Sequence, residues 1–321
     1  MNEVISETMP VGECKPYTIK DYQSNEPRWC KGCGDNGILR GTQLLLKDEQ
    51  LKPEKTVFVS GIGCASRFPH YMKTYGFHGL HGRALPFAQG IKMRRPDLNV
   101  FVNTGDGDCC SIGTAHWIHA IRYNMNMVCV LHDNAIYGLT KMQVSPTSPM
   151  GLKSNTSPRG AWLQPINPLV TTLGVNNVSF VAQSVDWNPA IFETILSRAF
   201  HHRGFSFIRV IQRCPNYLPT LLDPFAKNRE RVVMLHHENG LQLDEKTKKN
   251  YPNQLEHDPS DIHRAREIAS NTDVVPVGIL YQNEDVPCYD DIRAREKEFT
   301  PADIGAALNA ELDKFTVKAV G

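Results

Sequence analysis

The sequence lacks a long hydrophobic run, which excludes the common kind of membrane-spanning helix. No stretch of the chain approaches the roughly 18 consecutive apolar residues that such a helix needs. The N-terminal segment, MNEVISETMPVGECKPYTIK, also has no apolar core of signal-peptide length. We therefore expect a cytoplasmic protein that does not associate with a membrane.

An excess of charge of one sign is also missing. The 321 residues include 35 Lys and Arg against 34 Asp and Glu, which gives a formal net charge of +1. A protein that binds nucleic acid through the phosphate backbone usually carries a clear basic excess. We therefore expect no nucleic-acid partner, and the chemistry has to be sought in local motifs.

Short β-branched runs, in contrast, are frequent, and segments of helical length separate most of them. This alternation is typical of parallel strands that are buried on both faces and joined by crossover helices. It predicts an α/β fold with a mostly parallel sheet flanked by helices. The runs lie at residues 57–59, 100–102, 128–131, 179–181 and 207–211.

Composition divides the chain into three parts. Residues 1–24 are polar and aperiodic, and we interpret them as an N-terminal extension. Residues 25–225 hold the strand and helix alternation and form the expected cofactor-binding domain. Residues 226–321 turn polar and charged, and we expect a mixed C-terminal extension that makes contacts between subunits and contains an edge strand near 274–280.

Chemistry-bearing residues follow four of the predicted strands directly. In an open α/β sheet, ligands bind beyond the carboxyl ends of the strands, where loops and helix N-termini meet. The segments 60–64, 105–108 and 133–134 occupy such places, as does Cys214. The sequence therefore predicts one crevice at which all four loops converge.

The motif Gly-Asp-Gly at 105–107 indicates a magnesium diphosphate site. Taken alone it is equally typical of a tight turn between a strand and a helix. Asn134, however, follows Asp106 by 28 residues, at the end of the next strand. Magnesium prefers oxygen ligands, and Asp106, the side-chain oxygen of Asn134 and the backbone carbonyl of Ile136 could supply three. This spacing resembles the thiamine diphosphate motif.

Cysteine spacing indicates a second site. Cys30 and Cys33 have the two-residue spacing with which two thiolates meet one metal ion or cluster. Cys64 and Cys214, each in a loop at a strand end, are the best candidates among the nine cysteines for two further ligands. A structural zinc ion and an iron-sulfur cluster both fit this spacing, and the scattered second pair favours the cluster.

Three longer segments resemble a known family, the β subunits of 2-oxoacid:ferredoxin oxidoreductases. They are HGLHGRALPFA at 78–88, GDGDCCSIGTAHWIHAIRYN at 105–124 and DNAIYGLTKMQVSPT at 133–147. Together with the cysteine motif they follow the order found in that family, and the resemblance covers about residues 15–225. It implies the thiamine diphosphate-binding fold, with the diphosphate-binding domain in this chain.

The resemblance also implies roles for individual residues. Cys30, Cys33, Cys64 and Cys214 would bind a single 4Fe-4S cluster, while Asp106, Asn134 and Ile136 would bind Mg²⁺. Lys141, near the substrate carboxylate, and His81 would be the catalytic residues. The cofactor-binding residues would be Ile62, Gly63, Cys64, His81, Gly82, Gly105, Asp106, Gly107, Asp108, Asn134, Ile136, Gly138, Leu139 and Thr140.

The activity implied by the resemblance is the coenzyme A-dependent oxidative decarboxylation of a 2-oxoacid, with electrons passed through the cluster to ferredoxin. The two-subunit 2-oxoglutarate enzymes are the most similar, and pyruvate and branched-chain 2-oxoacids are the alternatives. An α subunit would bring the pyrimidine-binding domain with its activating glutamate. This chain is therefore expected to be inactive alone and to work in an (αβ)2 assembly.

Two other classes of protein share part of the pattern. A zinc-containing, magnesium-dependent phosphoryl-transfer enzyme would use a cysteine pair and an aspartate at a strand end, but its GxxxxGK[ST] loop is missing from the sequence. A noncatalytic electron-transfer subunit would need the cysteines without the Asp106 and Asn134 pair. Bound iron separates the first class from our interpretation, and bound thiamine diphosphate separates the second.

Overall fold

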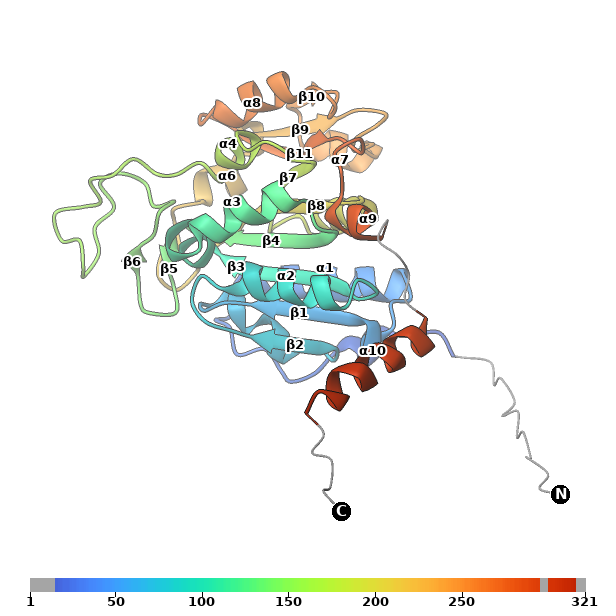
Figure 1. The fold of residues 1–321 in the computed structure, drawn as a ribbon. Helices are drawn as coiled ribbons and strands as arrows, with labels where there is room; N and C mark the ends of the chain where they lie inside the picture. The colour runs from blue at the N-terminus through green and yellow to red at the C-terminus, as the bar shows by residue number, and fades with distance from the viewer. Residues whose placement is uncertain (1–14, 295–299, 316–321) are drawn as a thin grey trace, which may run out of the picture.

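A computed structural model of the chain describes residues 15–294 and 300–315 (Figure 1). Its centre is a nine-stranded sheet in the order β10-β9-β11-β7-β8-β4-β3-β1-β2, and β5 and β6 form a separate hairpin. The strands are β1 (Thr56–Ser60), β2 (Tyr75–His78), β3 (Asn99–Gly105), β4 (Met127–Asp133), β5 (Ile136–Tyr137), β6 (Gln143–Val144), β7 (Phe180–Val185), β8 (Phe205–Ile211), β9 (Val232–His236), β10 (Gln254–Glu256) and β11 (Val275–Gln282).

Helices pack on both faces of this sheet (Figure 1). The side chains of α1 and α5 belong to the apolar core on one face, and those of α2, α3, α4 and α8 to the core on the other. The helices are α1 (Asp35–Asp48), α2 (Ala84–Arg94), α3 (Thr114–Tyr123), α4 (Pro168–Leu173), α5 (Pro189–His201), α6 (Asp223–Lys227), α7 (Glu245–Asn250), α8 (Ile262–Ser270), α9 (Tyr289–Ala294) and α10 (Pro301–Asp313).

The alternating direction of side chains along each strand explains why an apolar core lies on each face of the sheet. Successive side chains of a strand point to opposite faces, so a strand buried on both faces is apolar throughout. Phe58 stacks on Phe101 at 5.1 Å on the face covered by α1 and α5, while Val57 and Val59 belong to the opposite core. The predicted α/β fold with a mostly parallel sheet is therefore confirmed, and each of the five predicted runs lies in a strand or overlaps one.

The C-terminal part contributes more strands to the sheet than the one that the sequence predicted. Strands β9, β10 and β11 all come from residues after 225, and β11 pairs antiparallel with β7 and parallel with β9. The predicted strand near 274–280 is thus present, but the prediction of an edge position was wrong. Pro276 is tolerated there because pairing with β7 begins only at Gly278, so its missing N–H faces no partner in β7.

The predicted N-terminal extension lies partly outside the described residues, which begin at 15. In its described part, Tyr22 is fully buried and donates a hydrogen bond to the carbonyl of Leu51 at 2.8 Å. Residues 15–24 therefore pack against the body near the end of α1.

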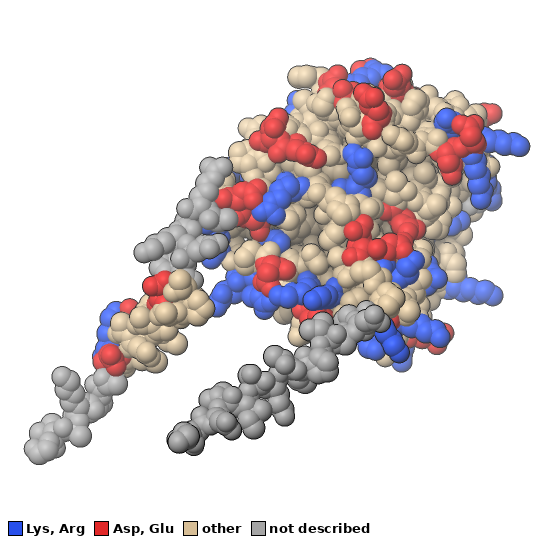
Figure 2. Space-filling view, turned by 90° about the vertical axis from the view of Figure 1, so that its right-hand side faces the viewer, with Lys and Arg blue, Asp and Glu red and all other residues tan. Residues whose placement is uncertain are grey.

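The distribution of charged side chains on the surface agrees with the small net charge of the sequence. On the face shown in Figure 2, acidic and basic side chains are interspersed. No helix in the described part of the chain is both long enough and apolar enough to cross a membrane.

Candidate cofactor site and cysteine cluster

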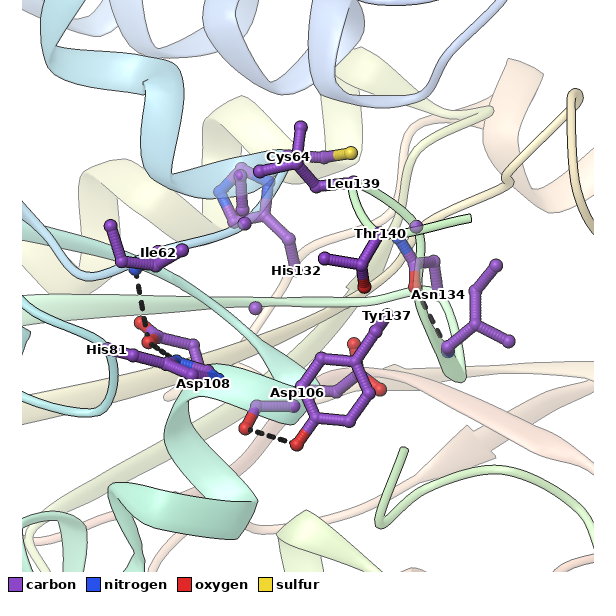
Figure 3. A pocket seen from close by; sticks show the side chains of 16 residues that line it. Ile62, Cys64, His81, Asp106, Asp108, His132, Asn134, Tyr137, Leu139 and Thr140 are labelled. Atoms are coloured by element: carbon purple, nitrogen blue, oxygen red, sulfur yellow. Dashed lines mark hydrogen bonds and ion pairs between the residues drawn. The ribbon is translucent and has the colours of Figure 1, made fainter. Parts of the chain in front are cut away.

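The loops after β1, β3 and β4 enclose a pocket at the carboxyl ends of these parallel strands (Figure 3). Sixteen residues line it. They include every predicted cofactor-binding residue except Gly82. The amide of Gly82 instead donates to the carboxylate of Asp108, a lining residue, at 2.6 Å. Ala65, His132 and Tyr137 also line the pocket and had not been predicted.

Asp106 is a buried carboxylate that lacks a cationic partner. The hydroxyl of Thr147 lies 2.8 Å from its Oδ2 and also 2.8 Å from Oδ1 of Asp133, and one hydroxyl proton cannot serve both carboxylates. Asp133 is paired with Arg209 at 2.6 Å, whereas no basic side chain among the described residues forms an ion pair with Asp106. Burial, and secondly the charge of Asp133, raise the pKa of Asp106 to about 7. A bound divalent cation would supply the missing positive charge.

Asn134 is held with its amide in a defined orientation. Its Nδ2 donates to Oε1 of Gln212 at 2.9 Å, and its Oδ1 accepts from the backbone amide of Ile136 at 3.1 Å. An amide oxygen has a second lone pair, so Oδ1 can still bind a cation. The predicted magnesium ligands Asp106, Asn134 and Ile136 all line the same pocket.

Asp108 fastens the loops around the pocket to one another. Its Oδ1 accepts from the amides of Ile62 at 3.1 Å and Gly82 at 2.6 Å and lies 2.6 Å from Nδ1 of His81, while its Oδ2 accepts from Thr104 at 2.8 Å. The residue is only 2% exposed. A single carboxylate therefore fixes the loops that follow β1, β2 and β3.

We expect the substitution Asp108→Asn to lower the free energy of unfolding by about 3 kcal/mol, because an amide cannot accept from all of these donors and leaves buried N–H groups unpaired. Urea unfolding monitored by circular dichroism measures the change. The matched control Asp97→Asn alters an exposed carboxylate at the other end of β3 and should leave the unfolding midpoint nearly unchanged. An equal midpoint for both variants would contradict the role given to Asp108.

The absence of a Cβ atom has a different effect at each of the two glycines of the Gly-Asp-Gly motif. A Cβ atom at Gly105 would meet nothing within 4 Å, and Gly105 lines the pocket. At Gly107 a Cβ would lie 2.2 Å from the ring of Tyr137, whose hydroxyl donates to the carbonyl of Gly107 at 3.1 Å. Gly105 thus leaves room for a ligand, and Gly107 leaves room for Tyr137.

Lys141 lies outside the pocket lining, at the exposed tip of the hairpin formed by β5 and β6. Lys141 and Met142 both have positive φ, at 72° and 75°, which is rare for residues other than glycine. The amide of Lys141 donates to the carbonyl of Gly138 at 3.1 Å. The hairpin therefore places this lysine at the surface, next to residues that line the pocket.

Three loops carrying the four predicted cysteine ligands are fastened to each other. Cys30 and Cys33 form a turn in which the amide of Cys33 donates to the carbonyl of Cys30 at 3.0 Å. The indole N–H of Trp29 donates to the carbonyl of Cys64 at 2.7 Å, and the amide of Gly34 to the carbonyl of Arg213 at 3.4 Å. The loops after β1 and β8 thereby meet the Cys30–Cys33 turn.

The sulfur atoms of Cys64 and Cys214 lie next to Gly138, which lines the pocket. A Cβ atom at Gly138 would lie 3.4 Å from Sγ of Cys64 and 4.0 Å from Sγ of Cys214. Burial, and then the charges of Asp35, Cys214 and Cys30, raise the pKa of Cys64 to about 12, and burial is the main cause that raises the pKa of Cys33.

Across the described residues, no group of three or more His, Cys, Asp or Glu side chains is arranged to hold a single metal ion.

Comparisons with known proteins agree with this site. Residues 61–210 match the family "Thiamine pyrophosphate enzyme, C-terminal TPP binding domain", and residues 244–298 match the family of the C-terminal part of the pyruvate ferredoxin oxidoreductase beta subunit. The 2-oxoacid:ferredoxin oxidoreductase subunit beta of Sulfolobus sp is 37% identical over 85% of this chain and 89% of its own length. This chain belongs to the 2-oxoacid:ferredoxin oxidoreductase β subunits.

Further relatives point the same way. The 2-oxoglutarate oxidoreductase subunit KorB of Mycobacterium tuberculosis is 43% identical over 226 residues, which are 70% of this chain and 60% of that protein. A structure of the 2-oxoglutarate:ferredoxin oxidoreductase from Magnetococcus marinus, with 2-oxoglutarate, coenzyme A and succinyl-CoA bound, superposes with a TM-score of 0.77 at 34% identity, over 93% of this chain and 97% of that chain.

This membership confirms the family predicted from the sequence motifs. The chain is the β subunit of an oxidoreductase that acts with an α subunit, and it carries a thiamine diphosphate-binding domain. The individual ligand residues, the magnesium ion and the cluster stay predictions.

Proposed function

We propose that this β subunit, together with an α subunit, converts 2-oxoglutarate and coenzyme A to succinyl-CoA and CO2, and passes the electrons through a 4Fe-4S cluster to ferredoxin. The structural relative with 2-oxoglutarate and succinyl-CoA bound, matched over nearly the whole of both chains, is the observation that carries the choice of substrate. Pyruvate and branched-chain 2-oxoacids are the alternative substrates.

The pocket residues suit a magnesium-bound diphosphate. Asp106 would neutralise part of the charge of Mg²⁺, with Asn134 and the carbonyl of Ile136 as further oxygen ligands. Gly105 would let the diphosphate approach the backbone, since no atom lies within 4 Å of the space a Cβ would take. Thiamine diphosphate, when bound, supplies the electron sink for decarboxylation of a 2-oxoacid.

The cysteines suit a cluster close to that cofactor. Cys64 lines the pocket (Figure 3). Its sulfur and that of Cys214 both lie within 4.0 Å of the position that a Cβ atom would take at Gly138. Cys30 and Cys33 would complete the four thiolates that a 4Fe-4S cluster requires. Because Cys64 belongs to both sites, electrons would have only a short distance to travel between them.

His81 and Lys141 are the side chains that we propose for contact with the cofactor and the substrate. His81 is half-buried and is held by Asp108 at 2.6 Å, which fixes the direction of its ring. Lys141 offers a positive charge for the substrate carboxylate at the hairpin tip. The rest of the substrate site would come from the α subunit, in an (αβ)2 assembly that functions in the cytoplasm.

The experiment is an anaerobic assay of the purified αβ complex with thiamine diphosphate, Mg²⁺, coenzyme A and ferredoxin. We expect ferredoxin reduction with 2-oxoglutarate to exceed that with pyruvate or 3-methyl-2-oxobutanoate at equal concentration. A preference for either of the other two acids would contradict the substrate assignment. Zinc in place of iron would contradict the cluster and favour the phosphoryl-transfer alternative.

A further inference from the structure

Gln212 joins the predicted magnesium site to the predicted cluster site through one side chain. It follows β8 directly, is 1% exposed, and its backbone amide donates to the carbonyl of Asp133 at 2.9 Å. Its Oε1 accepts from Nδ2 of Asn134 at 2.9 Å, and its Nε2 donates to Sγ of Cys33 at 3.2 Å and to the carbonyl of Arg213 at 2.7 Å. The oxygen of the Gln212 amide therefore contacts the predicted magnesium site, and its nitrogen contacts the predicted cluster site.

The contact with Asn134 decides which way that residue presents its amide. Because Oε1 of Gln212 can only accept, Nδ2 of Asn134 has to face it, and Oδ1 is left on the side of Ile136. That oxygen is the atom that a hard cation would bind. Loss of Gln212 would remove one of the two hydrogen bonds that hold this orientation and leave only the bond from the amide of Ile136.

The contact with Cys33 places a hydrogen-bond donor on a ligand sulfur. A carboxylate oxygen of Asp35 lies 3.5 Å from the same sulfur, and its other oxygen lies 2.7 Å from Nδ1 of His132. A nearby carboxylate disfavours additional negative charge on the sulfur, whereas an N–H donor favours it. Reduction of a cluster adds negative charge, so the donor from Gln212 should make reduction easier.

We propose that Gln212 is a positioning residue that orients Asn134 for magnesium and at the same time raises the reduction potential of the cluster through Cys33. This inference rests on the proposed function, since it requires both the cofactor and the cluster. It adds a direct hydrogen-bonded connection between the two, made by a residue that binds neither.

Two substitutions separate the two roles. Gln212→Met has a similar length and cannot form either hydrogen bond. In its ionised form, the side chain of Gln212→Glu keeps an acceptor for Asn134 but has no donor for Cys33. The matched control is Gln183→Met, which removes another buried glutamine of the sheet, bonded to the carbonyl of Pro276 at 2.6 Å and to Arg209 at 3.1 Å.

The measurements are made on the anaerobic αβ complex. An EPR-monitored redox titration gives the midpoint potential of the cluster, and activity against Mg²⁺ concentration gives the apparent affinity for the ion. We expect Gln212→Met to shift the potential to a more negative value and to weaken Mg²⁺ binding about tenfold, which is the usual cost of losing a residue that orients a metal ligand. Gln212→Glu should shift the potential in the same direction without weakening Mg²⁺ binding. Gln183→Met should change neither.

The outcomes distinguish this inference from the function on which it rests. If the parent complex contains iron and thiamine diphosphate and both Gln212 variants keep the parent potential, the inference is wrong and the proposed function stands. If the parent complex contains no iron, the proposed function itself fails. Should Gln212→Met not assemble, Gln212→Glu decides: an unchanged potential overturns the role at Cys33, and weakened Mg²⁺ binding overturns the role at Asn134.

Discussion

Replacing Asp106 by alanine is expected to lower kcat of the αβ complex at least about 1000-fold, because loss of a residue that merely orients a metal ligand already costs about 10- to 100-fold and a direct ligand contributes more. The physical reason is the uncompensated charge of this site: Asp106 is 1% exposed and shares a single hydroxyl with Asp133. Without its carboxylate, Mg²⁺ would lose a charged ligand and the diphosphate its anchor. The measurements are kcat and the thiamine diphosphate retained after gel filtration.

The iron content of the Asp106→Ala complex should remain that of the parent, because Cys64 lies on the other side of the pocket from Asp106 (Figure 3). Asp97→Ala is the matched control, since it alters a carboxylate near the opposite end of β3 that pairs with Lys55 and Arg95 on the surface. We expect parent activity for this control. Retained thiamine diphosphate in Asp106→Ala would contradict the magnesium assignment.

Replacing Cys64 by alanine is expected to eliminate the low-potential EPR signal of the cluster and, with it, ferredoxin reduction. Cys64 connects the two predicted sites, because it lines the cofactor pocket and its sulfur, like that of Cys214, lies next to Gly138. A 4Fe-4S cluster needs a thiolate on each iron, and loss of one ligand commonly prevents stable assembly. The measurements are the reduced EPR spectrum and the number of iron atoms per chain.

Cys129→Ala provides the control for the loss of a buried thiol. Cys129 is fully buried in β4, within the apolar core on the face of α2 and α3. Its replacement should leave the EPR spectrum and the iron content unchanged. An unchanged spectrum in Cys64→Ala would remove Cys64 from the ligand set and require another residue at the cluster.

The sequence predicts those parts of the site that depend on local order along the chain. Strands that are buried on both faces have a distinctive composition, and in a parallel sheet their carboxyl ends meet at one edge. Residues that directly follow β1, β3 and β4, such as Cys64, Asp106 and Asn134, could therefore be assigned to one pocket. The family resemblance extended this assignment to neighbouring residues such as Gly138.

Contacts between distant segments could not be predicted in this way. Gln212 and Cys33 are 179 residues apart, and nothing in either neighbourhood indicates that they touch. The position of Gln212 directly after β8 was the available signal, since the rule that selected Cys214 applies to it equally. Tyr137 was missed for a related reason: its place in the site depends on packing against Gly107.

The edge position assigned to β11 failed for a reason that is also structural. Proline within a strand favours an edge because it cannot donate to a neighbour. Here the partner strands are staggered, so that Pro276 pairs with Val233 of β9 before the pairing with β7 begins. The stagger is a property of the assembled sheet, and the local sequence does not specify it.

The central claim is that one chain holds both the diphosphate end of thiamine diphosphate and a 4Fe-4S cluster. The most direct test is anaerobic purification of this chain with its α subunit, followed by determination of iron, zinc and thiamine diphosphate and by EPR of the reduced complex. We predict about four iron atoms and one thiamine diphosphate per β chain, with the EPR signal of a reduced 4Fe-4S cluster. A colourless complex that contains zinc and no thiamine diphosphate would contradict the claim.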